Sequence, residues 1–325
     1  MSNQNHKTSI GGQALIEGIM MRGPKGSAIA VRLPNKEIEV TPMEEKRFAD
    51  THKWAKTPVI RGVVAFVESL TYGYKYLMFT ADKSMEDDEE YVPESKLDKW
   101  LDEHFNEKAM AVIEIFSMIL GLLIAFFLFM YLPAWLVDTF DAHVTKDFLE
   151  AHNLHPLFEG ILKIIILVIY MYVMSRTKEI KRVFMYHGAE HKTIFCYEAG
   201  LPLTVENVRK QIRFHPRCGT SFTIVMLLIS ILFSTVLVLI FPGIGKIRWL
   251  WILAKLLIIP LIMGLGYEFI KYAGRKDNLV SRVLSKPGLW MQRITTIEPT
   301  DDMIEVGIAA FNAVRTDNPE DDKIS

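Results

Sequence analysis

The centre of the chain's first long apolar segment reads Leu122-Leu123-Ile124-Ala125-Phe126-Phe127-Leu128-Phe129. This run lies within residues 115–137, a stretch of 23 residues that contains no aspartate, glutamate, lysine or arginine. A bilayer core roughly 30 Å thick is crossed by about 20 helical residues, so the stretch is long enough to span it. Such an apolar cluster is unusual for the buried helix of a soluble protein. The stretch therefore predicts a transmembrane helix.

Three further segments have the length and hydropathy of membrane spans. Residues 218–245 are free of charged residues over 28 positions. Residues 157–175 and 249–267 each carry a lysine near one end, Lys163 and Lys255 respectively. A lysine near a helix end can extend to the interface or form an ion pair, so neither residue excludes a span. We expect a mainly α-helical, polytopic membrane protein with four transmembrane helices.

The composition excludes several other classes of protein. Lysine and arginine number 37 and aspartate and glutamate 38, which gives a net charge of −1. A protein that binds nucleic acid through a globally basic surface is therefore excluded, and we expect no sequence-specific nucleic-acid partner. An aromatic content of 11% excludes a largely disordered chain. The two cysteines, Cys196 and Cys218, are too few for the disulfide framework of a small secreted protein.

The loops between the predicted spans carry unequal numbers of basic residues. Residues 176–217 contain nine lysines and arginines, whereas residues 138–156 contain one. Loops rich in lysine and arginine stay in the cytoplasm. We therefore predict a multi-pass protein of the cell membrane whose central loop and both termini are cytoplasmic.

Outside the spans the sequence is more polar. Residues 27–33 and 37–40, separated by Pro34-Asn35-Lys36, predict a β-hairpin, and the glycine-rich run 11–24 indicates tight turns or close backbone approach. Thr57-Pro58 predicts the start of an amphipathic helix, for which we favour the membrane surface over packing against a span. The predicted parts are a β-rich N-terminal cytoplasmic region (1–56), the amphipathic helix with an acidic connector (57–110), a four-helix membrane domain (111–270) with a helical cytoplasmic central loop (176–217), and a C-terminal cytoplasmic segment (271–325).

The central loop contains the first group of residues suited to chemistry. It reads Tyr186-His187-Gly188-Ala189-Glu190-His191-Lys192. In a helix His187 and His191 lie one turn apart on one face, where two imidazoles can share a metal ion at about 2.0–2.1 Å. Glu190 falls on the adjoining face, where it can act as a general base. The order H-x-x-E-H is that of the inverted zinc-peptidase motif.

A second group of metal-ligating side chains follows about two dozen residues later. The run Phe214-His215-Pro216-Arg217-Cys218-Gly219 places an imidazole and a thiol at a chelating spacing, and these two groups are common in zinc sites. A helix from residue 205 to about 214, capped by Thr204, is expected to return the chain toward the first pair. We therefore predict a site for zinc or another divalent metal. Its predicted members are His187, His191 and His215 or Cys218 as ligands, Glu190 as the catalytic base, and Glu17, Glu198 and Glu268 as reserve ligands.

Alternatives to this catalytic metal site stay open. Histidines beside a basic membrane interface can bind lipid headgroups or hydrogen-bond each other, and Cys218 can serve as a small apolar residue at the start of a span. A metal can also be structural. A site whose four positions are all filled by protein ligands is closed, whereas a catalytic site keeps one position open.

Six runs, spread over nearly the whole chain, are specific enough to identify relatives. They are Gly11-Gly12-Gln13-Ala14-Leu15-Ile16-Glu17-Gly18, His187-Gly188-Ala189-Glu190-His191-Lys192-Thr193, Asn207-Val208-Arg209, His215-Pro216-Arg217-Cys218-Gly219-Thr220-Ser221-Phe222, Pro287-Gly288-Leu289-Trp290 and Thr295-Thr296-Ile297-Glu298-Pro299. Together they resemble the YqhQ family, a bacterial membrane family of unknown function whose members are often labelled predicted metal-dependent enzymes. The resemblance implies an inner-membrane location and, through the same histidines and cysteine, a metal-dependent activity.

Two hypotheses for the function follow from these features. The first is a membrane-embedded metal-dependent hydrolase whose site faces the cytoplasm and acts on a peptide bond near the membrane or on a lipid-linked ester. The second is a non-catalytic scaffold or biogenesis factor, in which a metal only stabilises the central loop and the chain docks a membrane or cytoplasmic protein partner. Both require the lipid bilayer as a partner. Transport is disfavoured because no predicted span carries a polar centre.

Overall fold

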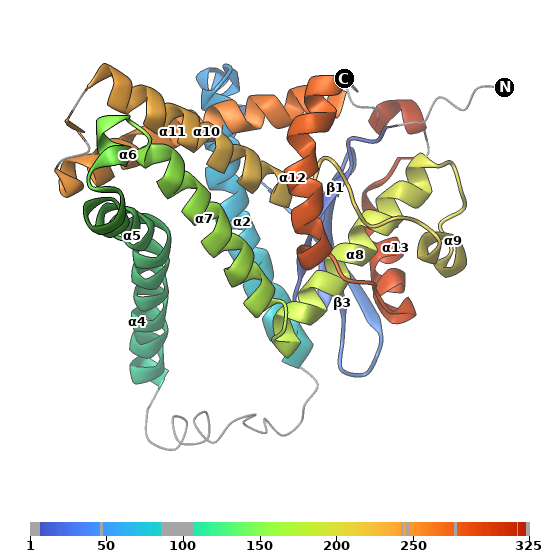
Figure 1. Ribbon diagram of the computed structural model, residues 1–325. Helices are drawn as coiled ribbons and strands as arrows, with labels where there is room; N and C mark the ends of the chain where they lie inside the picture. Colours follow the sequence, from blue (N-terminus) through green and yellow to red (C-terminus); the bar gives the residue numbers. More distant parts are fainter. Residues whose placement is uncertain are drawn as a thin grey trace. The chain divides into compact units, whose positions relative to one another are not determined.

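The computed structural model describes residues 7–45, 48–85, 107–241, 243–244, 247–275, 278–316 and 318–322. These residues are mainly helical, with a small antiparallel sheet near the N-terminus, which confirms the predicted fold class at this level (Figure 1). The acidic connector that we predicted lies largely outside them. The chain forms two compact units, which we call the sheet unit (Met1–Asp87, Val168–Ile229 and Ile259–Ser325) and the helical unit (Asp88–Leu167 and Ser230–Ile258).

The described helices differ widely in length. The α-helices are α1 (Phe48–Thr51), α2 (Ile60–Met85), α4 (Glu107–Phe126), α5 (Leu132–Phe140), α6 (Phe148–Ala151), α7 (His155–Met174), α8 (Lys178–Glu198), α9 (Val205–Arg209), α10 (Gly219–Ile240), α11 (Arg248–Arg275), α12 (Leu279–Thr295) and α13 (Asp301–Val314). Short 3-10 helices occupy Lys53–Lys56 and Pro319–Asp322, and π-helical turns occupy Phe127–Tyr131 and Asp141–Thr145.

The sheet is built from four strands in the described residues. They pair antiparallel in sequence order: β1 (Gly11–Leu15), β2 (Gly18–Gly23), β3 (Gly26–Arg32) and β4 (Ile38–Met43). The pairing of β3 with β4 confirms the predicted hairpin. The glycine-rich run 11–24 supplies β1 and β2, which we did not predict. Its expected close backbone approach is present, because a Cβ atom on Gly12 would lie 2.6 Å from the Met20 carbonyl oxygen.

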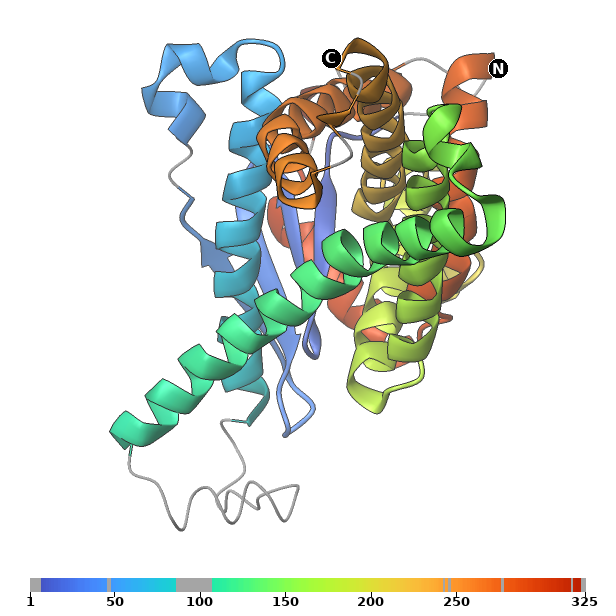
Figure 2. The same cartoon turned by 60° about the vertical axis from the view of Figure 1, so that its left-hand side comes forward.

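Helices cover both faces of the sheet within the sheet unit. On β2 the side chains of Ile19 and Met21 belong to a buried cluster shared with α8 and α13. Met20, which points the other way, belongs to a second cluster with Tyr76 of α2. Figure 2 shows α2 in front of the sheet. A strand covered on both faces needs apolar side chains at successive positions, and β2 has them in Ile19, Met20 and Met21.

The amphipathic helix predicted from Thr57-Pro58 is α2, and it packs inside the sheet unit. Its first turn carries Arg61, which forms an ion pair with Glu268 of α11. This contact agrees with the alternative that the helix packs against a span. Val67 and Leu70 are exposed on α2, and by helical spacing they lie on the side opposite the sheet.

The described residues contain four helical segments that are long and apolar enough to cross a membrane. They are Ile115–Thr145, His155–Met174, Phe222–Ile240 and Trp249–Tyr272, and they correspond to the four predicted spans. The first extends beyond the predicted end at Val137 because the helix continues through π-helical turns. One of these turns comes directly before Pro133 in the first turn of α5, where the missing proline N–H disturbs the regular hydrogen-bond ladder.

Lys163 and Lys255, which the sequence places inside spans, are paired in the helical unit. Both contact the carboxylate of Glu159, whose exposed fraction is 1%, with Lys163 Nζ at 3.0 Å. The Trp251 indole N–H donates to the second oxygen of this carboxylate over 3.1 Å. Buried charges are tolerated when they are paired and hydrogen-bonded. Pairing therefore accounts for both lysines.

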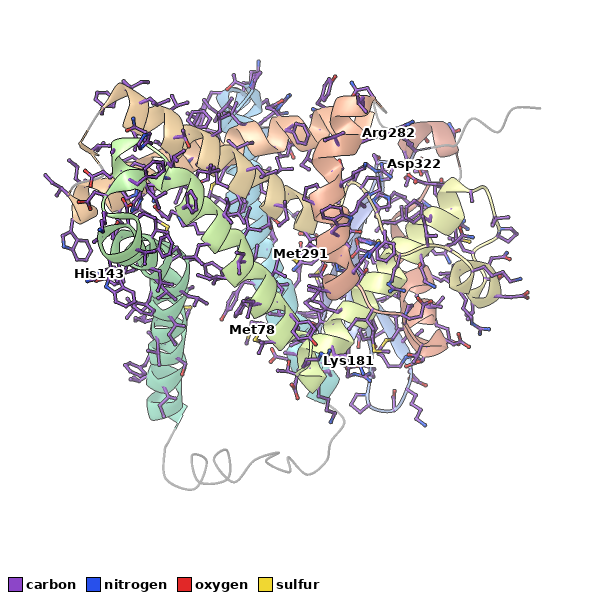
Figure 3. All side chains as sticks on the ribbon, in the orientation of Figure 1. Met78, His143, Lys181, Arg282, Met291 and Asp322 are labelled. Atoms are coloured by element: carbon purple, nitrogen blue, oxygen red, sulfur yellow. The ribbon has the colours of Figure 1, made fainter. Side chains whose placement is uncertain are left out.

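Two helices differ from the sequence-based expectation. The helix predicted from residue 205 to about 214 ends at Arg209, although Thr204 caps it as expected by accepting a hydrogen bond from the Asn207 N–H. The residues that follow make hydrogen bonds to other elements, described below, in place of further helical ones. Helix α12 was not predicted. Met291, labelled in Figure 3, lies on α12 and is buried.

Gly188, in the middle of α8, packs directly against the backbone that follows α12. A Cβ atom at this position would lie 2.1 Å from the carbonyl oxygen of Ile297. We predict that Gly188→Ala lowers the free energy of unfolding by about 3 kcal/mol, because a main-chain atom cannot move aside as a side chain can. Gly219→Ala is the matched control, since a Cβ atom there meets no heavy atom within 4 Å. Thermal unfolding in detergent tests the pair, and equal melting temperatures would contradict this packing.

Candidate metal centre

His187, Glu190 and His191 lie on the helix expected for them. Helix α8 runs from Lys178 to Glu198, and most of its residues from 186 to 196 are buried. The ring centroids of His187 and His191 are 4.4 Å apart. The two imidazoles therefore share one face of the helix, as their spacing predicts.

A main-chain carbonyl group fixes the protonation of His187. Its Nδ1 lies 2.8 Å from the carbonyl oxygen of Thr295. A carbonyl oxygen only accepts hydrogen bonds, so Nδ1 carries the proton and donates it. In the neutral ring the lone pair is then on Nε2, which lies 3.1 Å from the Sγ atom of Cys218.

His191 is fixed in the same way by a different part of the chain. Its Nδ1 lies 2.6 Å from the carbonyl oxygen of Arg213 and donates to it. The lone pair of the neutral ring is therefore also on Nε2. One ligand atom each from His187, His191 and Cys218 lies within 4.8 Å of the others. The structure thus brings together the predicted histidine pair and the predicted cysteine.

Cys218 is positioned by the segment that connects α9 to α10. Gln292 of α12 holds this segment, because its side-chain oxygen accepts from the His215 N–H and its amide donates to the His215 carbonyl, each over 2.7 Å. The Cys218 N–H donates to the same His215 carbonyl over 3.3 Å. Gln292 is fully buried, and its role has no signal in the sequence, because no local pattern relates α12 to residue 215.

His215, the other predicted ligand of this segment, lies beside the group of three. Its ring centroid is 5.5 Å from that of His191. Its Nδ1 accepts from the Arg217 main-chain N–H over 3.3 Å, and its Nε2 lies 4.0 Å from a carboxylate oxygen of Glu198. Burial, together with the positive charge of Arg217, holds the pKa of His215 well below its usual value. His215 is therefore a neutral neighbour of the group at pH 7.

Glu190 is buried next to the two histidines. Burial raises its pKa to about 7, against the opposing influence of His187 and a hydrogen bond from the Gly12 main-chain N–H. Its Oε2 atom is buried and has no hydrogen-bond partner among the described residues. An unpaired buried carboxylate oxygen is costly in a folded protein. A group that carries positive charge or donates hydrogen bonds would relieve this cost.

The segment Thr295–Pro299 runs alongside α8 and supports the centre. The Ile297 N–H donates to the Phe184 carbonyl over 2.9 Å. Glu298 forms ion pairs with the buried Lys192 and with Arg213. In the sequence this run stands out only through the resemblance to a family. The hydrogen bond that Thr295 accepts from His187 shows what the run does.

The three reserve ligands lie in ion pairs outside the group. Glu17 pairs with Arg182, and Glu198 pairs with Arg217. Glu268 pairs with Arg61, as described above. In this structure the three carboxylates are therefore engaged with guanidinium groups, and none belongs to the group of His187, His191 and Cys218.

The centre opens into a cavity of about 700 Å³ within the sheet unit. Strand β1 and the preceding residues line one side over residues 9–14, and α8 lines another with its histidines and Glu190. Gly219 and Thr220 at the start of α10, and Tyr267 and Ile270 near the end of α11, complete the wall. Ligand sites commonly occupy cavities of roughly 300–1,000 Å³, so a small molecule or a short stretch of polymer fits here.

This arrangement has the features expected of a divalent-metal site. Two imidazole nitrogens and a thiolate form a donor set typical of zinc. Each imidazole donates its other N–H to a main-chain carbonyl, as metal-bound histidines usually do. A nearby cation would stabilise the charged form of the buried Glu190 carboxyl, whose Oε2 atom has no hydrogen-bond partner among the described residues. Three protein ligands beside an open cavity leave a fourth coordination position for water or substrate.

The two hydrogen bonds between the Gln292 side chain and the His215 main chain lead to a prediction about Cys218. Gln292→Ala removes two buried hydrogen bonds, so we expect a loss of about 2 kcal/mol in unfolding free energy. We also expect faster alkylation of Cys218 by N-ethylmaleimide, because the segment before α10 is released. Arg293→Ala, at the exposed neighbouring position, is the control and should change neither quantity. Unchanged alkylation in Gln292→Ala would show that Cys218 is positioned by other contacts.

Comparison with known proteins places the chain in a family. Residues 57–317 match the model of the family described as "Protein of unknown function (DUF1385)". The chain is also 34% identical over 316 residues to "Uncharacterized protein YqhQ" of Bacillus subtilis (strain 168), across 96% of this chain and 94% of the relative. No solved structure matches it. These findings confirm the resemblance seen in the sequence: the chain belongs to the YqhQ-like DUF1385 family, whose function is unknown.

Proposed function

We propose that this protein is a metal-dependent hydrolase that holds zinc, or a similar divalent cation, with His187, His191 and Cys218. One observation carries the proposal. Both histidines donate their Nδ1 proton to main-chain carbonyls, which leaves Nε2 as the free ligand atom of each neutral ring. One ligand atom from each histidine lies within 4.8 Å of the other and of the Cys218 sulfur. A divalent cation bound by these three groups would replace the 3.1 Å contact between His187 Nε2 and the Cys218 thiol, and the thiol would lose its proton.

A catalytic metal fits this geometry better than a purely structural one. The cavity beside the three ligands gives water and substrate access to the fourth coordination position. When bound, the cation supplies Lewis acidity that polarises a carbonyl group and makes water more acidic. Glu190 supplies the base: its unpaired Oε2 takes a proton from the attacking water and returns it to the leaving group.

We further propose that the four apolar helices cross the cell membrane, with both termini and the central loop in the cytoplasm. The support comes from the length and hydropathy of the helices and from the nine basic residues in residues 176–217. Cys218 directly precedes α10, so the centre then lies at the cytoplasmic surface of the membrane. Substrates are accordingly a peptide bond near the membrane or a lipid-linked ester.

Metal content provides the first test of the proposal. Elemental analysis of the detergent-purified chain should give about one zinc ion per chain, as expected for a single three-ligand site. His187→Ala, His191→Ala and Cys218→Ser should each abolish this content, because each removes one of three ligands. His215→Ala is the matched control and should retain the metal. Loss of metal in His215→Ala alone, or zinc retention in all three ligand variants, would refute the ligand set.

Glu190→Gln separates catalysis from metal binding. The substitution preserves shape but removes the base, so the variant should keep its zinc and fail to complement a strain that lacks the gene. Glu206→Gln, on α9, is the control and should complement, because Glu206 is exposed and pairs with the exposed Lys210. Full complementation by Glu190→Gln would show that the metal is structural, and would leave the scaffold hypothesis in its place.

A further inference from the structure

Strand β1 is an edge strand of the sheet. In the described residues it pairs with β2 on one side, and no strand pairs with it on the other. An edge strand presents main-chain N–H and carbonyl groups that another extended chain can bind. Three of its residues, Gly11, Gly12 and Ala14, have small or no side chains, so its backbone is poorly shielded.

The strand register shows which groups face away from the sheet. The two-residue loop Ile16-Glu17 joins Leu15 to Gly18, and in such a hairpin the main-chain groups of these two residues hydrogen-bond to each other. Along an antiparallel pair of strands, hydrogen-bonded and non-hydrogen-bonded residue pairs alternate. Gln13 is therefore bonded to β2, whereas Gly12 and Ala14 direct their N–H and carbonyl groups to the free edge.

The hairpin of β2 and β3 shows independently that the main-chain groups of Gly12 face the free edge. The pair Gly23 and Gly26 closes the hairpin of β2 and β3 and is hydrogen-bonded, so by alternation Met21 is hydrogen-bonded to Ala28. The main-chain groups of Met21 therefore point toward β3, and Met21 is not hydrogen-bonded to Gly12, its neighbour on β1. The hydrogen bond from the Gly12 N–H to Glu190 also requires that Gly12 points outward. The hydrogen bonds of the described residues leave the Ala14 N–H and carbonyl unpaired on that edge.

This free edge borders the metal centre. Gly12, Gln13 and Ala14 line the same cavity as His187, Glu190 and Cys218. A Cβ atom on Gly12 would lie 3.1 Å from the carboxyl carbon of Glu190, so the edge directly contacts the proposed base. A chain bound along β1 therefore passes beside Glu190.

We propose that the substrate is an extended stretch of polypeptide, which binds as an additional strand on β1 with its scissile amide beside Glu190. The inference rests on the proposed hydrolase function and specifies its substrate class. The Ala14 N–H donates to a substrate carbonyl, and the Ala14 and Gly12 carbonyls accept from substrate N–H groups. A lipid-linked ester lacks a repeat of donors and acceptors at about 3.4 Å per residue and cannot use this edge.

The reaction balances as a simple hydrolysis. The amide C–N bond breaks and a C–O bond to the water oxygen forms. Glu190 takes one water proton and delivers it to the leaving amine nitrogen, so no oxidant or reductant is needed. Tyr267 and Ile270, which lie in a candidate span, line the same cavity. A chain bound in this cavity therefore contacts a helix that we propose crosses the membrane.

Ala14→Pro tests the inference. Proline lacks the N–H that faces the free edge but does not interrupt the bonds to β2, and edge strands tolerate it at such positions. Ala14→Val is the matched control, because valine also enlarges the side chain but keeps the N–H. Both substitutions are made in the zinc-loaded, full-length Glu190→Gln chain, so that bound peptide is not turned over. The probes are fluorescent heptapeptides of mixed sequence and the same peptides N-methylated at every second residue.

We expect unmodified peptides to bind the Glu190→Gln chain and its Ala14→Val variant alike, and the Ala14→Pro variant about tenfold more weakly. N-methylated peptides should compete poorly, a readout that holds even where Ala14→Pro misfolds. Zinc content is measured in every sample, so loss of metal identifies a failure of the proposed centre itself. With zinc retained, equal binding by the proline and valine variants overturns the inference. Binding of phosphatidylglycerol vesicles but no peptide also overturns it.

Discussion

Two hydrogen bonds from imidazole Nδ1 atoms to main-chain carbonyls organise the whole centre. The acceptors, Thr295 and Arg213, come from segments distant from α8 in the sequence. Turning either ring would leave a part-buried carbonyl and a part-buried N–H without their partners, at a cost of up to about 1–3 kcal/mol for each group. The tertiary fold thus decides which nitrogen of His187 and His191 is free to act as a ligand, and it places Cys218 within 4.8 Å of a ligand atom of each ring.

The surrounding packing keeps those two carbonyls in place. Gly188 allows α8 to approach the backbone near Ile297 more closely than any other residue type would. Lys192, buried within α8, donates to the Arg209 carbonyl and pairs with Glu298, so one side chain joins both supporting segments to the helix. A buried charge that loses its partner is strongly destabilising. Displacement of either segment is therefore opposed by both packing and electrostatics.

The features that could be predicted from the sequence are those with a local or periodic signal. The four long apolar helices follow from hydropathy, and the convergence of His187 with His191 follows from helical spacing. The choice between His215 and Cys218 did not follow from the sequence, because both residues contact α8. Only the fold shows that Cys218 lies within ligand distance of both histidines. Gln292 acts across 77 positions and has no pattern to reveal it. The glycines of β1 and β2 concealed these strands, since glycine is depleted in sheets.

The sheet supplies main-chain hydrogen-bonding groups that the long apolar helices do not offer along their length. In a helix the main-chain donors and acceptors bond to each other, and a lipid environment makes that internal pairing obligatory. Away from their first and last turns, the helices around the cavity therefore contribute side chains only. Strand β1, at the edge of the sheet, presents a row of main-chain groups that can bind another chain, and it lies against Glu190. The placement of a small sheet beside three convergent ligands is explained if recognition of a polypeptide backbone and its hydrolysis take place in one cavity.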